Sequence, residues 1–293
     1  MSKREYIIST DATSDMSAEY IEENNVNLID MTYSFNGEEY TTRGEKTLPL
    51  KDFYYKCANE DVPKTSQVPV DTARKIFESY VKQGLDVFHL CFSSALSGTY
   101  QSCSIAANLV MEQYPEAKIV VVDSLSASGG HGLLLNYAVN RKKAGLSVEE
   151  LGVDVESNIQ HFCHYFTVSD LNYLHKGGRV SKLSAVVGSA LGIKPILHVS
   201  EEGKLIPIGK VRGRKQALIE LADKMESKYV KNNGNPVYIF HGDSLEDAEF
   251  LASVIEKKFA LKNIRIGEIG PIIGAHSGPG TIALFFYGKD RIE

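Results

Sequence analysis

The chain turns from a strand into a helix across residues 87–99, VFHLCFSSALSGT. The apolar run from Val87 to Phe92 is typical of a buried strand, and a helical pattern begins near Thr99. Between them lie three hydroxyl side chains and a glycine: Ser93, Ser94, Ser97 and Gly98. The first N–H groups of a helix are unpaired and partly positive, and serine hydroxyls both donate and accept hydrogen bonds. The junction therefore predicts a site for a carboxylate or phosphate, with helix capping by Ser97 as the plain alternative.

Two further polar segments favour the anion site. Residues 64–69, KTSQVP, place Thr65 and Ser66 just before a predicted helix from Val70 to Gln83, and Pro69 suits its first turn. Residues 274–280, GAHSGPG, place His276 in a predicted glycine-rich loop between two apolar runs. A protonated histidine there would pair with a carboxylate. We expect the three loops to converge at one edge of a sheet.

Composition and charge exclude several classes of protein. The 293 residues are 43% hydrophobic and 24% charged, which is ordinary for a globular protein of one large or two medium domains. The 32 basic and 37 acidic residues give a net charge of −5, which argues against a general affinity for nucleic acid or for an anionic membrane. No segment approaches the ~20 apolar residues of a membrane span, and the first residues lack a signal-peptide core. We therefore expect a cytoplasmic protein without stable membrane insertion.

The four cysteines are scattered and form no Cys-x-x-Cys pair. This spacing argues against structural zinc, and we expect Cys91 and Cys103 to be buried, unreactive thiols. The histidines other than His276 follow no spacing that a metal requires. We interpret His89, His161, His164, His175, His198 and His241 as structural or surface residues.

Short apolar runs alternate with helical patterns along the chain. Before residue 160 we expect strands at 6–9, 26–35, 87–92 and 118–122, a hairpin turn at Asn36-Gly37, and helices at 50–59, 70–83, 99–113, 133–143 and 151–160. This βαβ order predicts a mainly parallel sheet with helices on both faces. After it we expect strands at 162–168, 194–199, 205–211, 237–240 and 264–269, a short helix from Ser169, and helices from Gln216 and Leu245. The domains are predicted as 1–160 and 161–293, both α/β.

The usual catalytic motifs are absent from the sequence. No Gly-x-Gly-x-x-Gly follows the first strand, and no Walker loop is present. A triad of Ser94, His276 and Asp123 is conceivable by residue type alone. A serine hydrolase that acts on acyl esters through Ser94 or Ser124 therefore stays open as an alternative, and a lipid-responsive regulatory sensor is another.

Seven blocks in order along the chain resemble the DegV family of bacterial lipid-binding proteins. They are Thr65-Ser66-Gln67, the run from Ser93 to Ser102, Asp123-Ser124, residues 176–179, Lys194-Pro195-Ile196-Leu197, Lys210-Val211-Arg212 and His276-x-Gly278-Pro279-Gly280. The resemblance implies a two-domain α/β fold, with a mixed sheet in the C-terminal domain, that holds a long-chain fatty acid between its domains. It also implies a non-catalytic subunit whose bound carboxylate is phosphorylated by a separate ATP-binding fatty acid kinase subunit. The acyl phosphate would feed phospholipid synthesis.

The resemblance also assigns residues. Thr65, Ser93 and Ser94 would bind the carboxylate together with Ser66, and His276 would lie close to the same head group. Arg179, Arg212 and His276 would contact the kinase subunit or the phosphate. The chain departs from the commoner pattern at Val68 and at residues 126–131, and the second departure could alter the pocket wall.

An enclosed apolar tunnel is the physical requirement for such a ligand. Burying about sixteen carbons at ~0.8 kcal/mol per methylene gives on the order of 10 kcal/mol before entropy losses. Candidate lining residues, which an ordinary core would also use, are Ile29, Phe166, Val186, Val187, Leu191, Ile193 and Ile273. No metal or other cofactor is expected. The sequence leaves acyl length, unsaturation and oligomeric state open.

Overall fold

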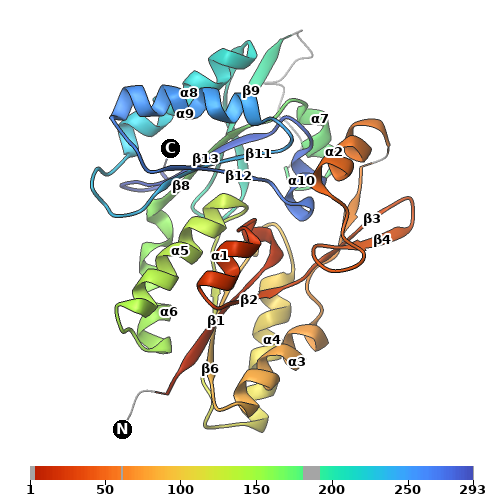
Figure 1. Cartoon of the computed structure of the whole chain (residues 1–293), viewed down its shortest axis with the longest axis vertical. Helices are drawn as coiled ribbons and strands as arrows, with labels where there is room; N and C mark the ends of the chain where they lie inside the picture. Colours follow the sequence, from red (N-terminus) through yellow and green to blue (C-terminus); the bar gives the residue numbers. More distant parts are fainter. Residues whose placement is uncertain (1–3, 61, 181–191, 293) are drawn as a thin grey trace.

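The described part of the chain contains two large sheets and one small sheet (Figure 1). The computed structural model describes residues 4–60, 62–180 and 192–292. The first large sheet is parallel throughout and has the strand order β2-β1-β6-β7. Its strands are β1 (Tyr6–Asp11), β2 (Val26–Ile29), β6 (Asp86–Cys91) and β7 (Ile119–Asp123).

Helices cover both faces of this parallel sheet, as the sequence predicts. One face packs against α3 (Val70–Lys82) and α4 (Thr99–Gln113). The other face packs against α5 (Gly129–Lys143) and α6 (Val148–Asn158). Side chains alternate between the two faces along each strand, so that Ile7 joins the first core and Ile8 the second. The helix α6 begins with the capping box formed by Ser147 and Glu150.

The second large sheet is mixed and has the strand order β10-β9-β8-β13-β11-β12. Only the pair β11 and β12 is parallel among its neighbouring strands. The strands are β8 (Phe162–Thr167), β9 (Ile193–Val199), β10 (Leu205–Arg212), β11 (Val237–His241), β12 (Ile264–Glu268) and β13 (Ile282–Tyr287). One face packs against α8 (Arg214–Lys228) and α9 (Leu245–Phe259).

A small antiparallel sheet lies beside the two large ones and is formed by β3 (Thr32–Phe35), β4 (Glu38–Thr41) and β5 (Lys64–Thr65). Its aromatic side chains pack with α2 (Leu50–Asn59) and α10 (Pro271–Ser277). The Tyr54 hydroxyl donates to the carbonyl of Ile269 at 2.7 Å, which ties α2 to the end of the mixed sheet. Two short helices, α1 (Ala18–Glu23) and α7 (Leu171–Lys176), complete the elements used below.

The helix α5 is buried between the two large sheets. Residues 129–136, Ala138 and Val139 are all buried. Its leucines Leu133, Leu134 and Leu135 belong to one core with Phe88 of the parallel sheet and Phe285 of the mixed sheet. A helix that is apolar all round is stable only when it is enclosed, and α5 is enclosed by both sheets. The two halves of the chain therefore share one hydrophobic core.

Two predicted elements are wrong in detail. The stretch from Val26 to Phe35 is not one strand, because it divides after Ile29: β2 joins the parallel sheet and β3 joins the small sheet. The hairpin after it is confirmed, with Asn36 at φ 49° and Gly37 at φ 88° as a two-residue loop requires.

His276 lies in a helix and not in a glycine-rich loop. Pro271 starts α10, and the helix ends at Gly278, whose φ of 77° favours glycine. The glycines at 274 and 278 suggested a loop, but Ile272 and Ala275 are buried at helical spacing and hold the turn together. The elements α1 and β5 are not predicted from the sequence, because they are too short for a periodic signal.

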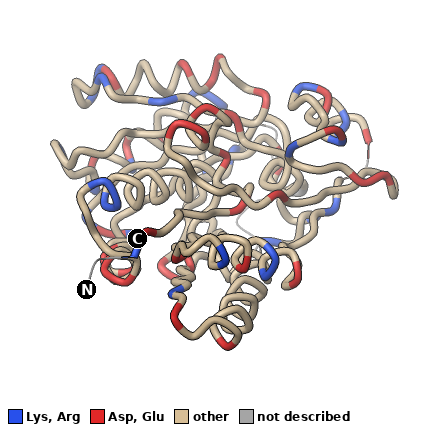
Figure 2. The backbone as a smooth tube through the Cα atoms, turned by 60° about the horizontal axis from the view of Figure 1, so that its bottom comes forward, with Lys and Arg blue, Asp and Glu red and all other residues tan. Residues whose placement is uncertain are grey.

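The surface carries both signs of charge. Figure 2 shows Lys and Arg interspersed with Asp and Glu along the described backbone in that view. Of the helices described, none combines the length and the apolar character needed to traverse a bilayer.

Arg291 ties the end of the chain to the first half. Its guanidinium is 2% exposed and donates to the Phe162 carbonyl, the Leu125 carbonyl and the Ser126 hydroxyl, at 2.6, 2.6 and 2.7 Å. The acceptors follow β7 and begin β8, so one side chain connects both large sheets. Burial lowers the pKa of Arg291 to about 9.

We predict that Arg291→Ala lowers the free energy of unfolding by about 2 to 4 kcal/mol, because three buried acceptors lose their donor. Urea denaturation measures the change. The exposed Arg265→Ala is the matched control and should change stability far less. Equal effects of the two substitutions would contradict the proposed tie.

Candidate functional site

A pocket of about 200 Å³ opens where the parallel, mixed and small sheets meet. Its walls come from the ends of β5 and β6, from the loop before α5, from α10 and from β8, β9, β10 and β13. The apolar lining consists of Met31, Phe92, Leu96, Ala127, Phe166, Leu174, Val199, Leu205, Ile269, Ile272, Ile273, Ala283 and Phe285. The polar lining consists of Thr65, Ser66, Gln67, Ser97, Ser128, His164, Arg179, His276, Ser277 and Thr281. The loops after the parallel strands and the segments around β5 and α10 do converge, as the sequence predicts.

A hydrogen-bonded polar cluster lies on one side of this pocket. His276 Nε2 is 2.8 Å from Thr65 Oγ1, and its Nδ1 is 3.0 Å from the carbonyl oxygen of Gly177. Arg179 Nη1 donates to the same carbonyl at 2.7 Å and lies 3.4 Å from His276 Nδ1. Arg179 Nε also donates to the Leu96 carbonyl at 3.4 Å. Four separate segments thus meet around one imidazole ring.

The local backbone explains why these groups can approach one another. Thr65 pairs with Tyr33 in the small sheet, which fixes the direction of its side chain. Gly177 ends α7 beside α10, where an added Cβ would lie 3.0 Å from His276 Nδ1. A side chain at position 177 would therefore press on His276, and the glycine eases the close approach of the two segments.

His276 is neutral at pH 7. Burial and the adjacent Arg179 guanidinium lower the pKa of His276 to about 4. The contact of Nδ1 with the Gly177 carbonyl is shorter than its contact with Arg179, which favours a proton on Nδ1. Nε2 then carries the lone pair and accepts the hydroxyl proton of Thr65. Burial also lowers the pKa of Arg179, which stays cationic.

Ser93 and Ser94 lie beside the pocket but do not line it among the described residues. Ser93 is buried, and its hydroxyl donates at 3.0 Å to the carbonyl of Gly203 in the turn between β9 and β10. An added Cβ at Gly203 would lie 2.2 Å from Ser93 Oγ. Ser94 is exposed, and its backbone N–H donates to Asp123 at 3.1 Å. The residues on either side, Phe92 and Leu96, do line the pocket.

Ser97 is not the N-cap of α4, contrary to the capping alternative, although its hydroxyl lies at the start of the helix. Its hydroxyl accepts from the Thr99 N–H at 3.2 Å, while Gly98 occupies the cap position of α4. The Val68 N–H is in turn 3.3 Å from the Thr99 hydroxyl, so the segment around β5 is joined to α4.

The two arginines expected to meet a partner lie in different surroundings. Arg179 is half-buried at the pocket beside His276. Arg212 is exposed at the end of β10, an edge strand of the mixed sheet, and does not line the pocket.

The apolar lining was predicted in part. Phe166 and Ile273 line the pocket, whereas Ile29 belongs to the core of the parallel sheet and Ile193 lies outside the described lining. Val186, Val187 and Leu191 lie outside the described residues. The sequence predicts a structural or surface role for His164, yet this residue lines the pocket. The alternation of β8 could have placed it on the face of Phe166.

A serine protease-like triad is not assembled in the described part of the chain. Ser94 contacts Asp123 through its backbone and not through its hydroxyl. Both nitrogens of His276 face Thr65, Gly177 and Arg179. Ser124 Oγ donates to the Ser126 carbonyl at 3.4 Å. The geometry therefore gives no support to a hydrolase built on these residues.

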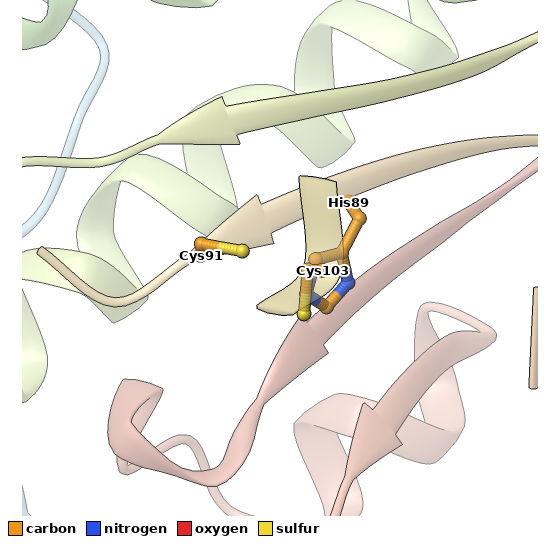
Figure 3. Close-up of side chains that lie close together, drawn as sticks. All are labelled: His89, Cys91 and Cys103. Atoms are coloured by element: carbon orange, nitrogen blue, oxygen red, sulfur yellow. The ribbon is translucent and has the colours of Figure 1, made fainter. Parts of the chain in front are cut away.

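A second group of histidine and cysteine side chains is buried between the parallel sheet and α4 (Figure 3). His89 and Cys91 of β6 and Cys103 of α4 have ligand atoms within 4.8 Å of one another. His89 Nδ1 is 3.0 Å from Ser9 Oγ, and burial raises the pKa of Cys91. The expected burial of the thiols is confirmed. Three donors fall one short of the four that structural zinc takes.

The chain is similar to known proteins. A family model described as "Uncharacterised protein, DegV family" matches residues 6–289. A DegV domain-containing protein of Clostridium perfringens is 41% identical over 288 residues, which cover 98% of this chain and 99% of that protein.

Solved structures agree with this relationship. A DegV lipid-binding protein from Thermotoga maritima superposes with a TM-score of 0.83 at 30% identity, covering 98% of this chain and all of that one. The Streptococcus pneumoniae fatty acid kinase B3 protein, loaded with linoleic acid, has the same fold, with a TM-score of 0.83 at 22% identity over 97% of this chain and 99% of that one. An all-parallel sheet and a mixed sheet around a shared pocket, together with a match over nearly the whole length, show that the chain belongs to the DegV family.

Proposed function

We propose that the pocket binds a long-chain fatty acid and presents its carboxylate to a separate kinase subunit. The observation that carries the proposal is the Thr65–His276–Arg179 cluster at the wall of an otherwise mainly apolar pocket. Such a site suits a ligand with one polar end and a long apolar remainder. The Thermotoga maritima protein, a lipid-binding protein by its name, supports the proposal.

The apolar wall would supply most of the binding free energy. A chain of about sixteen carbons buried at ~0.8 kcal/mol per methylene gains on the order of 10 kcal/mol before entropy costs. Phenylalanine and aliphatic side chains from the mixed sheet and α10 are placed to contact it. The carboxylate would need donors, because a buried anion without partners is strongly destabilised.

We assign the carboxylate to the hydroxyls of Thr65 and Ser66 and to the imidazole of His276. Thr65 and His276 already share a hydrogen bond, and Ser66 follows Thr65 into the pocket wall. Ser93 and Ser94 stay in the proposal as donors of the neighbouring loop. Ser93 would have to release the Gly203 carbonyl to reach a ligand. No other cofactor is part of this proposal.

Binding of the carboxylate would change the protonation of His276. While Nε2 accepts the Thr65 proton, the Thr65 oxygen has no hydrogen left for an anion. An adjacent carboxylate favours the charged imidazole and raises its pKa. A protonated Nε2 would donate in place of accepting and would free the Thr65 hydroxyl for the carboxylate. We therefore infer that fatty acid binding is coupled to proton uptake.

The phosphoryl transfer itself would belong to a partner. In this proposal the chain orients the nucleophilic oxygen, and an ATP-dependent kinase subunit forms the acyl phosphate for phospholipid synthesis. Arg179 and His276 lie beside the proposed head group, and Arg212 is exposed on the edge strand β10. These three residues are our candidates for contact with the kinase subunit. The name of the Streptococcus pneumoniae relative motivates the partnership.

We also propose that residues 1–160 and 161–293 form two domains around the ligand. The strands of the parallel and small sheets all precede residue 161, and those of the mixed sheet all follow it. The pocket receives walls from both ranges. The shared helix α5 would keep the two domains in fixed contact.

Thr65→Val keeps the shape of the side chain and removes its hydroxyl. We expect fatty acid affinity to fall about tenfold, since one hydrogen bond to the carboxylate is lost. Titration with stearic acid, followed by native mass spectrometry, measures the change. Thr32→Val in the same small sheet lies outside the described pocket lining and should bind normally. Ser93→Ala tests the neighbouring loop in the same assay. Unchanged affinity in both Thr65→Val and Ser93→Ala would refute the head-group assignment.

We predict that the pKa of His276 differs between the ligand-free and the fatty-acid-bound protein. In the ligand-free protein the ring should titrate near pH 4, below its value of about 6.5 in an unfolded chain. Its contribution to stability is therefore complete above pH 6.5 and is lost as the pH falls towards 4. With fatty acid bound, or in Arg179→Gln, the pKa should rise. NMR titration of the ring protons measures all three states, with Arg179→Lys as the charge-preserving control. A pKa that the ligand leaves unchanged would exclude coupled proton uptake.

Arg212→Ala should distinguish contact with the kinase subunit from binding of the fatty acid. We expect acyl phosphate formation with the kinase subunit to drop at least about tenfold, as for loss of an interfacial arginine, while stearic acid binding stays normal. Arg265→Ala, an exposed arginine on β12 at the opposite edge of the mixed sheet, is the control. Equal losses of binding and phosphorylation in Arg212→Ala would count against a docking role.

A further inference from the structure

The pocket contains a second histidine that the head-group proposal does not use. His164 lies on β8, on the same face as Phe166, and its residue is 2% exposed. Among the residues that the structure describes, neither ring nitrogen of His164 makes a side-chain hydrogen bond of ordinary geometry, and the backbone of Phe162 interacts with the ring only weakly. Buried polar groups are nearly always paired, so two unpaired nitrogens in one ring call for a partner that comes with the ligand.

The side chains around His164 hold its ring in place but offer its nitrogens no hydrogen-bonding group. The ring meets Phe285 edge-on, with centroids 5.4 Å apart and an interplanar angle of 86°. On the side of α5 it packs against Gly130, where an added Cβ would lie 2.0 Å from Nε2. Phe166 and Ala283 continue the pocket wall and offer no polar side-chain atom.

His164 is neutral and therefore carries one donor and one acceptor. Burial, the cation of Arg291 and the neighbouring His198 lower its pKa well below the usual value. A neutral imidazole matches a ligand group that can both donate and accept, or that accepts through a lone pair. The carbons of a plain alkyl chain can neither donate nor accept a hydrogen bond.

The strand register places His164 away from the head-group cluster. Thr167 pairs with Ile282, next to Thr281, whose hydroxyl donates to the carbonyls of Ser277 and Gly278 at the end of α10. His164 pairs with Phe285, three residues along β8 from Thr167, which corresponds to roughly 10 Å. With a carboxylate near His276, the part of an acyl chain that passes His164 would be its middle.

We propose that this pocket recognises an acyl chain that carries an oxygen substituent, a hydroxyl or a keto group, near mid-chain, and that His164 is the residue that selects it. The proposal rests on the proposed fatty acid binding and narrows its ligand class. A plain saturated chain leaves both nitrogens unpaired. A double bond offers only a weak N–H contact to its π electrons.

The test is a competition among acyl chains of equal length. The full chain, stripped of lipid, is incubated with an equimolar mixture of stearic acid, oleic acid, hydroxystearic acids with the hydroxyl near the head, at mid-chain or near the tail, and a mid-chain ketostearic acid. The retained lipids are extracted and quantified by mass spectrometry. We expect a mid-chain hydroxy or keto acid to be retained about tenfold over stearic acid, as for one buried hydrogen bond.

Variants of the pocket wall assign the preference to its residue. His164→Phe keeps an aromatic ring beside Phe285 and should abolish the preference while stearic acid is still bound. His164→Gln keeps a donor and an acceptor and should retain part of it, which also covers the case in which His164→Phe fails to fold. Phe166→Leu alters the volume of the same wall and should keep the preference.

The outcomes separate this inference from the proposed function. A wild-type protein that binds stearic acid but shows no preference for the oxygenated chains overturns the inference alone. A preference that persists in His164→Phe, or a His164-dependent preference for oleic acid only, overturns it as well. A protein that retains none of the six acids contradicts fatty acid binding itself.

Discussion

The enclosure of α5 is the constraint on which the other features of this chain depend. The helix is apolar around most of its circumference and must be covered on both sides, which brings the parallel and mixed sheets together. Its first residues follow the loop at Ala127 and Ser128, which forms part of the pocket wall. The position of the pocket is thus a consequence of how one buried helix is covered.

The pocket combines two kinds of surface that would each be unfavourable alone. Its apolar wall exposes side chains that water hydrates poorly, and its polar cluster holds an arginine and a histidine in a partly dry setting. The low pKa of His276 reports that setting, because burial and Arg179 both disfavour the charged ring. An anionic ligand with an apolar tail would cover the apolar wall with its tail and pair with the polar cluster through its charged end.

Much of the fold follows from local patterns, and the failures have physical causes. The βαβ order, the hairpin at Asn36-Gly37 and the helices on both faces were predictable from periodicity and turn residues. The division of the stretch between Val26 and Phe35 was not, because both strands are extended segments with buried side chains and only tertiary pairing distinguishes their sheets. The helix around His276 was hidden by two glycines: Gly274 packs closely against Phe53 and Tyr54, and Gly278 packs against Tyr173.

The candidate site, like the fold, could be predicted from the sequence only in part. Of the predicted site residues, Thr65, Ser66, Arg179 and His276 line one pocket. Ser93, Ser94 and Arg212 do not line it. The cluster of His89, Cys91 and Cys103 was missed, because only the packing of α4 against the parallel sheet brings Cys103 beside the two side chains of β6.

The absence of a side chain at Gly130 has an evolutionary consequence. The imidazole of His164 occupies the space in which any Cβ at position 130 would have to stand. The two positions are therefore expected to vary as a pair: relatives with a larger residue at the start of this helix should carry a smaller one on the facing strand, and their acyl chains would meet a wall of a different character.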